Sequence, residues 1–463
     1  MKFQDKCVTI VGVGISGIAA ANLLTEENAN IVLYDGNADL QAEEVRKRLV
    51  PAYKGTFVFG EFTKELIEQT EILVMSPGVP TDLPFVLELE KRGVPVIGEI
   101  ELAYLFSKGK IVAITGTNGK TTTTALTSHI MKTYYENVFT VGNIGIPYTQ
   151  MICETTEDSV TVAEISSFQL ETARTFHPNV SMILNITPDH LNRHHTMANY
   201  IEAKERIAKN QNADDICILN YEDSVLREFG ETLPCQVMWF SSKQKLESGL
   251  YVEDGIIFYA KDEVAECICK VSELNIIGRH NHENAMAAIA AGIAMHVPFE
   301  CIHKALIEFQ AVEHRVEYVA TKNGVRYYND SKGTNPDAAI QAIRAMNSPT
   351  LLIAGGYDKG SDYDEWIEAF DGKVKHLVLL GQTREKIAEA AGRLGVEQIQ
   401  LTDTFKEAFD FCVQHAESGD AVLLSPACAS WGMFKNYEER GRIFKEYVYA
   451  IEDSSAIDSN TEK

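Results

Sequence analysis

The sequence has few of the features that mark exported or membrane-spanning proteins. Its nine cysteines are scattered and only Cys267 and Cys269 lie close together, so neither a disulfide framework nor a zinc-finger spacing is present. No apolar run reaches the roughly 18 residues of a membrane-spanning helix. The apolar stretch from Val8 to Leu24 contains three glycines, and no small-residue cleavage site follows it. We therefore expect a cytoplasmic protein without a membrane span.

Positive charge is also scarce. The chain has 42 Lys and Arg against 66 Asp and Glu, which gives a formal net charge of -24. Nucleic acids and anionic membranes are bound through clustered cations, so neither is an expected partner, and an anionic substrate would need locally placed positive groups. With 45% hydrophobic and 23% charged residues, the composition is that of a globular protein.

At 463 residues the chain is long enough for roughly three domains of about 150 residues each. Short apolar runs alternate with glycine turns and helical patterns along the chain, which predicts an α/β fold with parallel sheets. We expect an N-terminal Rossmann-like domain (residues 1–98), a central P-loop-type domain (99–311), a C-terminal Rossmann-like domain (312–451) and a polar tail (452–463). Several strand-like runs between residues 214 and 277 predict a small antiparallel addition to the central sheet.

A glycine-rich turn lies between the first predicted strand and helix. Residues 12–17 read GVGISG, and Asp35 ends the next predicted strand. In this context backbone amides can approach a pyrophosphate at the helix N-terminus. By itself the motif fits NAD or FAD, another diphosphate ligand, or a purely structural turn.

A second glycine loop, TGTNGKTT at residues 115–122, is a stronger signal. Its glycines would open backbone amides toward phosphate oxygens, Lys120 would neutralise the β- and γ-phosphates, and the Thr121 hydroxyl would reach magnesium. The loop departs from the full Walker pattern because Ile114 stands where the leading glycine is expected. The alternative is a helix N-terminus that is merely capped by threonines.

Two side chains that follow predicted buried strands are candidates near this loop. Glu164 ends the strand from residue 159 to 165, at the edge where parallel sheets bind ligands, although it could instead cap the helix that begins near Ser166. His190 ends the run NITPDH just beyond the strand predicted for residues 180–186. For His190 a surface-loop position is the alternative, and for His194 and His195 it is the preferred interpretation.

Lys204 lies within a predicted helix, in the run YIEAKER. Acidic neighbours on the same helix favour an ordinary solvated lysine. The residues alone therefore assign Lys204 no role.

Taken together, these runs resemble the Mur ligase family over nearly the whole chain. The run AEISSFQLE at residues 163–171 is very similar to the one that marks the D-glutamate-adding member. The resemblance implies an ATP- and magnesium-dependent ligase that joins D-glutamate to UDP-N-acetylmuramoyl-L-alanine through an acyl phosphate, and we expect a monomer. A folate polyglutamate ligase, a dinucleotide-dependent dehydrogenase and a nucleotide-gated binding protein are the rival classes.

The resemblance also implies roles for individual residues. Those expected at the UDP precursor are Gly14, Ile15, Ser16, Gly17, Asp35, Ser76, Asn143 and His190. Those expected at ATP are Gly116, Thr117, Asn118, Gly119, Lys120, Thr121, Thr122, Thr123, Asn281, Asn284, Arg315, Asp330 and Lys332. Those expected at D-glutamate are Thr334, Lys359, Ser430 and Tyr437.

The catalytic set that the resemblance implies is Lys120, Glu164, His190 and Lys204. Two magnesium sites are expected, one at Thr121 and Glu164 and the other at His190 and a carbamylated Lys204. Carbamylation would turn the lysine into an oxygen ligand, which magnesium prefers.

Overall fold

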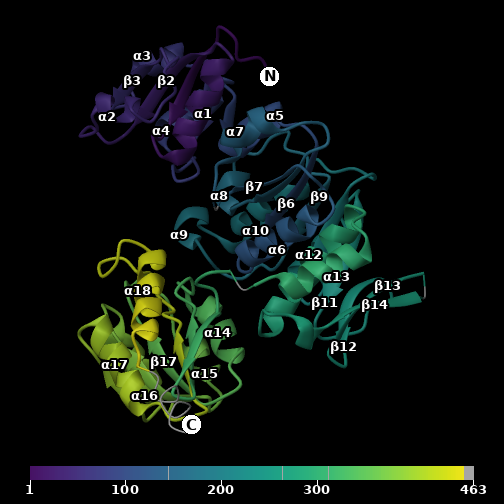
Figure 1. Cartoon of the computed structure of the whole chain (residues 1–463). Helices are drawn as coiled ribbons and strands as arrows, with labels where there is room; N and C mark the ends of the chain where they lie inside the picture. Colours follow the sequence, from purple (N-terminus) through teal and green to yellow (C-terminus); the bar gives the residue numbers. More distant parts are fainter. Residues whose placement is uncertain (144, 263, 311, 453–463) are drawn as a thin grey trace, which may run out of the picture. The chain divides into compact units, whose positions relative to one another are not determined.

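The computed structural model describes residues 1–143, 145–262, 264–310 and 312–452, and its strands form three sheets (Figure 1). The first sheet has five parallel strands in the order β3-β2-β1-β4-β5, as expected for a Rossmann-like domain. Its strands are β1 (Cys7–Val11), β2 (Asn30–Asp35), β3 (Thr56–Phe59), β4 (Ile72–Met75) and β5 (Val96–Gly98), and the helices between them are α1 (Ile15–Glu26), α2 (Ala42–Arg46), α3 (Lys64–Gln69) and α4 (Pro84–Lys91).

The second sheet has nine strands in the order β14-β13-β12-β11-β10-β9-β6-β8-β7. Its strands are β6 (Lys110–Thr115), β7 (Val138–Gly142), β8 (Val160–Glu164), β9 (Val180–Ile183), β10 (Ile216–Asn220), β11 (Gln236–Ser241), β12 (Gly249–Glu253), β13 (Ile256–Lys261) and β14 (Val264–Lys270). Its helices are α5 (Glu99–Phe106), α6 (Lys120–Lys132), α7 (Tyr148–Met151), α8 (Ser167–Leu170), α9 (Leu191–His194), α10 (Met197–Glu205), α11 (Ser224–Gly230), α12 (Arg279–Ala294) and α13 (Phe299–Glu308).

The antiparallel addition to this sheet is smaller than predicted. The strands β10, β11 and β12 continue the parallel sheet, and the antiparallel pairs among the described strands are β12 with β13 and β13 with β14. The prediction was too broad because short apolar runs do not reveal the direction of pairing. The strand expected to reach residue 186 ends at Ile183, although Leu184 N–H still donates to Thr115 O of β6.

The third sheet has six strands in the order β15-β16-β20-β17-β18-β19, with only the first pair antiparallel. Its strands are β15 (Glu317–Lys322), β16 (Val325–Asn329), β17 (Thr350–Ala354), β18 (Val374–Leu379), β19 (Ile399–Leu401) and β20 (Ala421–Leu424), and its helices are α14 (Pro336–Arg344), α15 (Asp364–Glu368), α16 (Arg384–Arg393), α17 (Phe405–His415) and α18 (Tyr437–Tyr449). The expected α/β class with three sheets is therefore confirmed.

The first two sheets belong to one compact unit, which comprises Met1–Glu273 and Glu283–Glu308, whereas Leu274–His282 and the chain from Phe309 onward form the other. One apolar cluster in the first unit includes Leu24 of α1, Ile100 of α5 and Tyr148 of α7. The predicted boundaries at 98, 311 and 451 stay predictions. Residue 311 and nearly all of the predicted tail, 453–463, lie outside the described residues.

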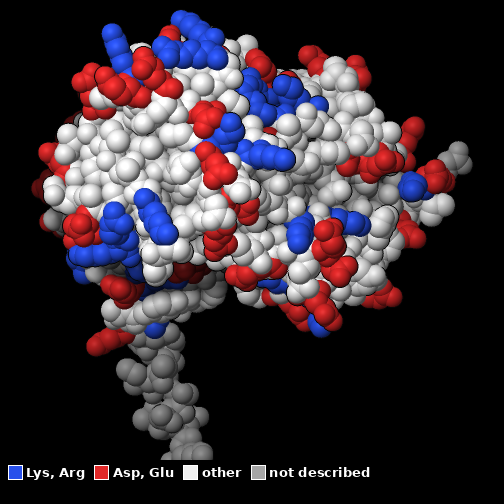
Figure 2. Space-filling model, turned by 90° about the horizontal axis from the view of Figure 1, so that it is seen from above, with Lys and Arg blue, Asp and Glu red and all other residues white. Residues whose placement is uncertain are grey.

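Charged side chains of both signs are distributed over the surface. On the face drawn in Figure 2, small groups of Lys and Arg alternate with groups of Asp and Glu. In the part of the chain that the structure describes, no helix combines the length and apolar character needed to cross a bilayer.

Candidate active site

The loop between β6 and α6 has the backbone geometry of a phosphate cradle. Gly116 and Gly119 have φ angles of 150° and 86°, which favour glycine. A Cβ on Gly119 would lie 2.2 Å from Asn284 Oδ1. Gly119 is also the N-cap of α6, so the threonines that follow lie inside the helix and do not cap it. The N-terminus of α6 thus has no side-chain cap, which is compatible with phosphate binding there, and the phosphate-loop interpretation stays a prediction.

Asn185, which the sequence analysis did not single out, supports this loop. Its Oδ1 accepts from Asn118 N–H at 2.8 Å, and its Nδ2 donates to Asn118 O at 3.1 Å. Its carbonyl accepts from Thr117 N–H at 2.9 Å. Its position just after a buried strand was the available signal, but only the fold shows that its partner lies 67 residues away.

Two lysine ammonium groups converge on one carbonyl of the loop. Lys120 Nζ donates to Gly116 O and Thr117 O at 2.8 Å each, and Lys204 Nζ donates to Gly116 O at 2.8 Å. Lys204 is 1% exposed, so its interpretation as a solvated lysine was wrong. Burial, followed by the charge of Lys120, lowers the pKa of Lys204 well below its ordinary value, while Asp189 opposes the shift. Burial therefore works against the charged form of this side chain.

Lys204 lies on the buried face of α10, together with Tyr200 and Ala203. Tyr200, one turn earlier on α10, is buried, and its ring centroid lies 4.7 Å from Lys204 Nζ. The Tyr200 hydroxyl lies 3.0 Å from Thr117 Oγ1. One face of α10 thus points at the phosphate loop. The acidic residues beside Lys204 in the sequence gave no signal of this.

Glu164 ends β8 beside the loop, in register with Ile114 of β6 and Gly142 of β7. Its side chain is buried, Oε1 accepts from Asn143 Nδ2 at 2.9 Å, and Oε2 has no hydrogen-bond partner among the described residues. The helix-cap alternative is wrong because Ser166 caps α8 in a capping box with Gln169. A buried carboxylate oxygen without a donor is costly unless a ligand or metal completes it.

His190 stands at the N-cap of α9 in a left-handed conformation, with φ 55° and ψ 28°. Its side chain is 46% exposed, its Nε2 lies 3.5 Å from Asp189 Oδ2, and its ring centroid is 4.9 Å from that of Phe168. His195 is exposed as expected. The surface-loop interpretation of His194 was wrong, because it is 4% exposed and its Nε2 lies 2.9 Å from Ser167 Oγ.

The N-terminal glycine turn leaves open space on its ligand side. A Cβ on Gly17 would lie 1.9 Å from Gly12 O, so that glycine is needed for packing, whereas a Cβ on Gly14 would meet nothing within 4 Å. Ile15 follows at 68% exposure. Asp35 Oδ2 accepts from Val13 N–H at 3.1 Å, so this carboxylate holds the turn itself.

The edge of the first sheet places Ser76 beside the same turn. Ser76 follows β4, and its Oγ lies 3.4 Å from Gly12 O. Ser16 lies in the first turn of α1, next to this point. The turn, its helix and the end of β4 thus lie together, and their role at the precursor stays a prediction.

The expected ATP residues are divided between the two compact units. Asn284 belongs to the first, where its Oδ1 accepts from Thr123 Oγ1 at 3.3 Å beside the phosphate loop. Asn281 belongs to the second and is buried, with Nδ2 donating to Ile277 O at 2.8 Å.

In the second unit, Asp330 is fully buried and accepts from Ser425 Oγ at 2.8 Å and from Val316 N–H at 3.2 Å. Burial raises the pKa of Asp330 to about 6, although the nearby Arg315 opposes the shift. Its contacts indicate that Asp330 holds the loop after β16 to the loop after β20.

Of the residues expected at D-glutamate, Thr334, Lys359 and Ser430 lie on loops of the second unit, and Tyr437 begins α18. Lys359 Nζ lies 5.4 Å from the centroid of the exposed Trp431 ring, next to the buried Ser430, and Lys332 Nζ lies 5.5 Å from that of Tyr437. Thr334 lies on the loop before α14, and its N–H donates to Lys332 O.

Arg440, which the sequence analysis missed, is buried and braces these loops. Its guanidinium donates to Ser331 Oγ at 2.9 Å, to Ser331 O at 2.7 Å and to Cys428 O at 3.3 Å. Its helical position gave no signal of these contacts.

Comparisons with known proteins bear on the whole chain. Three family descriptions match in order: "Mur ligase MurD-like, N-terminal domain" over residues 6–98, "Mur ligase middle domain" over 114–292, and "Mur ligase, glutamate ligase domain" over 314–428. A protein of Lachnoclostridium phytofermentans named UDP-N-acetylmuramoylalanine–D-glutamate ligase is 61% identical over 453 residues, which cover 98% of this chain and 100% of the relative. A protein of the same name from Lachnospira eligens is 54% identical, with 97% and 99% covered.

Solved structures support the fold. A pseudomurein peptide ligase type C from Methanothermus fervidus matches with a TM-score of 0.59 at 18% identity, covering 96% of this chain and 100% of that structure. The UDP-N-acetylmuramate-alanine ligase MurC from Thermotoga maritima matches with 0.58 at 19%, covering 96% and 99%. Because the curated relatives are 61% and 54% identical over nearly their full length, and the three family descriptions match in order, this chain belongs to the Mur ligase family.

Proposed function

We propose that the chain is the ATP-dependent ligase that adds D-glutamate to UDP-N-acetylmuramoyl-L-alanine in peptidoglycan precursor synthesis. The geometric observation that carries the proposal is a phosphate loop that is contacted by two lysines and bordered by a buried carboxylate oxygen without a partner. The curated relatives that share 61% and 54% of the sequence carry the name of this ligase. A dehydrogenase would leave the phosphate loop without a use.

The reaction begins when the L-alanine carboxylate attacks the γ-phosphate of ATP. This gives an acyl phosphate and ADP, and the amine of D-glutamate then displaces phosphate to form the amide. The attacking carboxylate and the γ-phosphate are both anions. Two unit charges about 4 Å apart interact by roughly 4 kcal/mol at an effective dielectric near 20, so the site must screen this repulsion.

Lys120 is the first group that supplies positive charge. Its ammonium donates to the carbonyls of Gly116 and Thr117. A bound triphosphate would give that ammonium stronger, charge-assisted partners in the same loop. The N-terminus of α6 would then face the phosphates, and Asn185, which accepts from the amides of Thr117 and Asn118, would keep the loop in shape.

The residues present suit magnesium, which prefers oxygen ligands. Glu164 Oε2 is buried and has no partner among the described residues. Thr121 lies in the first turn of α6, the helix that follows β6, and β6 is the strand next to the one that Glu164 ends. Among the described residues, no three His, Cys, Asp or Glu side chains cluster as a ready-made site. Magnesium held by Glu164 and Thr121 together with ATP oxygens would neutralise phosphate charge, and two sites remain our proposal.

Lys204 supports the second proposed site. Burial lowers the pKa of Lys204 and so favours its uncharged amine more than in an exposed lysine. The amine nitrogen can attack carbon dioxide and lose a proton to solvent, which gives a carbamate. The carbamate would supply oxygen atoms as ligands of the second magnesium, which an ammonium cannot bind. The carbamate would add a negative charge next to the phosphate loop, and the positive charge of Lys120 would compensate it.

The remaining assignments are also proposals. Gly14, Ile15, Ser16, Gly17, Asp35, Ser76, Asn143 and His190 would contact the UDP precursor, and Thr334, Lys359, Ser430 and Tyr437 would contact D-glutamate. The open space at Gly14 supports a diphosphate position there. A monomer in the cytoplasm remains our expectation.

Omission of single substrates tests the ligase reaction against a nucleotide-gated binding protein. We expect sustained phosphate release from ATP only when the precursor and D-glutamate are both present, because the acyl phosphate needs the amine to turn over. Phosphate release is measured with each substrate left out in turn. Steady ATP hydrolysis that neither substrate changes would refute the proposal.

A further inference from the structure

The turn that carries His190 is held in an unfavourable backbone conformation. His190 and His195, which flank the single-turn helix α9, have φ angles of 55° and 66°. Residues with a Cβ adopt this region rarely and keep it only when their surroundings enforce it. The contacts made by α9 itself should therefore determine where His190 lies.

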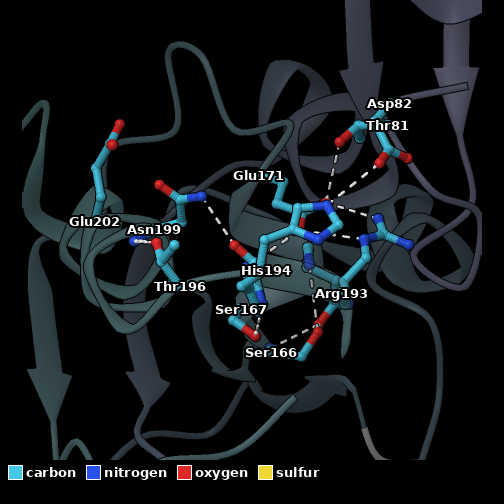
Figure 3. A network of polar contacts seen from close by, with 12 residues as sticks. Thr81, Asp82, Ser166, Ser167, Glu171, Arg193, His194, Thr196, Asn199 and Glu202 are labelled. Carbon is cyan, nitrogen blue, oxygen red and sulfur yellow. Dashed lines mark hydrogen bonds and ion pairs between the residues drawn. The ribbon is translucent and has the colours of Figure 1, made fainter. Parts of the chain in front are cut away.

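Arg193 makes the strongest of these contacts (Figure 3). Its Nη2 donates to Glu171 Oε2 at 2.6 Å and its Nε to Glu171 Oε1 at 3.3 Å. The same Nη2 donates to Val79 O at 2.9 Å, and Val79 follows β4 in the first sheet. The Arg193 side chain is 13% exposed and the Glu171 side chain 15%, so solvent screens this pair only weakly.

The Glu171 carboxylate joins the end of α8 to the loop after β4 and to α9. Thr81 Oγ1, from the first sheet's loop, donates to Oε2 at 3.3 Å, and His194 Nδ1 lies 3.4 Å from Oε1. Figure 3 shows Thr81, Arg193 and His194 arranged around this carboxylate. We call Val79, Thr81, Glu171 and Arg193 the clasp.

The clasp connects two parts of the proposed site. On one side, Val79 and Thr81 lie just after Ser76, where the precursor's nucleotide end is expected. On the other side, Arg193 lies on α9, the helix whose N-cap is His190. The guanidinium of Arg193 also lies 5.1 Å from the Phe168 ring, which in turn contacts the His190 ring.

We infer that Arg193 and Glu171 are positioning residues, which keep the His190 turn at a fixed place relative to the precursor-binding loop. This inference rests on the proposed function. A precursor anchored at one end must bring its L-alanine carboxylate to the γ-phosphate, and a misplacement of about 1 Å costs on the order of a hundredfold in rate. The clasp contributes this alignment without touching the reacting atoms.

A second arginine, Arg174, is the matched control, because it joins the two sheets without a described contact to the His190 turn. Arg174 joins the same two sheets, with Nη2 donating to Glu90 Oε1 at 3.0 Å and Nε to Val96 O at 3.3 Å. None of its contacts given for the described chain involves residues 189–195. A variant of Arg174 loses a bridge between the sheets but leaves α9 intact.

The test compares Arg193→Gln, Glu171→Gln and Arg174→Gln in the full chain. Arg193→Gln and Glu171→Gln should lower kcat by about tenfold or more while the KM for ATP changes by less than about twofold, because the nucleotide loop is untouched. Arg174→Gln should leave kcat within about twofold of the parent. Hydrogen exchange of residues 187–197 in the ligand-free chain should accelerate in the first two variants only.

Equal losses of kcat in the Arg174 and Arg193 variants, or unchanged kcat and exchange in Arg193→Gln, would overturn the inference. If Arg193→Gln folds poorly, Arg193→Lys replaces it in the test, because lysine keeps the charge and the bulk. Arg193→Lys should still lose the bidentate contact with Glu171 and show faster exchange. Failure of the proposed function is distinguishable, since the unsubstituted chain would then release no phosphate with D-glutamate. The exchange measurement needs no substrate and reports on the clasp in either case.

Discussion

Replacing Lys204 with alanine is expected to reduce ligase turnover by at least about a hundredfold, the scale seen when one pre-organised charge-stabilising group is lost. The side chain is 1% exposed and its ammonium contacts the phosphate-loop carbonyl of Gly116. If the lysine acts as a carbamate, short carboxylic acids should restore part of the lost rate, because they supply oxygen atoms to the vacated space. Turnover is measured by phosphate release with and without added acetate.

The exposed Lys209, which follows the same helix, is the matched control. Lys209→Ala should retain full activity and gain nothing from acetate. Nuclear magnetic resonance with isotope-labelled bicarbonate provides a readout that is independent of activity, since the unsubstituted chain should show a carbamate signal that Lys204→Ala lacks. Full activity in Lys204→Ala would remove this residue from the mechanism.

Replacing Glu164 with glutamine should produce a loss of similar size, again on the order of a hundredfold or more in kcat. The amide has nearly the same shape and can still accept from Asn143 Nδ2 through its oxygen. It cannot, however, offer the negative oxygen that is buried without a partner at Oε2. The loss should therefore come from the missing charge and not from altered packing.

The unfolding temperature distinguishes the loss of charge from altered packing. A buried charged oxygen without a partner destabilises the metal-free fold, so Glu164→Gln should unfold at the same temperature as the parent or higher. Added magnesium with nucleotide should raise the unfolding temperature of the parent more than that of the variant. A variant that retains activity, or one that unfolds at a clearly lower temperature, would contradict the proposed role of Glu164.

Much of the fold was predictable because its signals are local. The glycine loops at residues 12–17 and 115–122 stand between a strand and a helix as expected, and the strand ends bring Glu164 to the phosphate loop. Chain direction in β10 to β12 was not predictable, since an apolar run fits either pairing. The family resemblance also anticipated the function that the named relatives support.

The chemistry of single side chains was harder to predict because it depends on contacts that are distant in sequence. Lys204 has the acidic neighbours of a solvated lysine, yet its partner Gly116 lies 88 residues away. His194 follows a loop-like run, yet it packs beneath α8 against Ser167. Burial of this kind follows from tertiary packing, which neither periodicity nor charge pattern records.

The most direct test of the proposed function is phosphate release from ATP and magnesium with UDP-N-acetylmuramoyl-L-alanine, compared among D-glutamate, L-glutamate, L-lysine and no amino acid. We predict release with D-glutamate alone. Release with L-lysine or L-glutamate in place of D-glutamate would keep the ligase chemistry but contradict the assigned substrate, and no release with any amino acid would contradict the function itself.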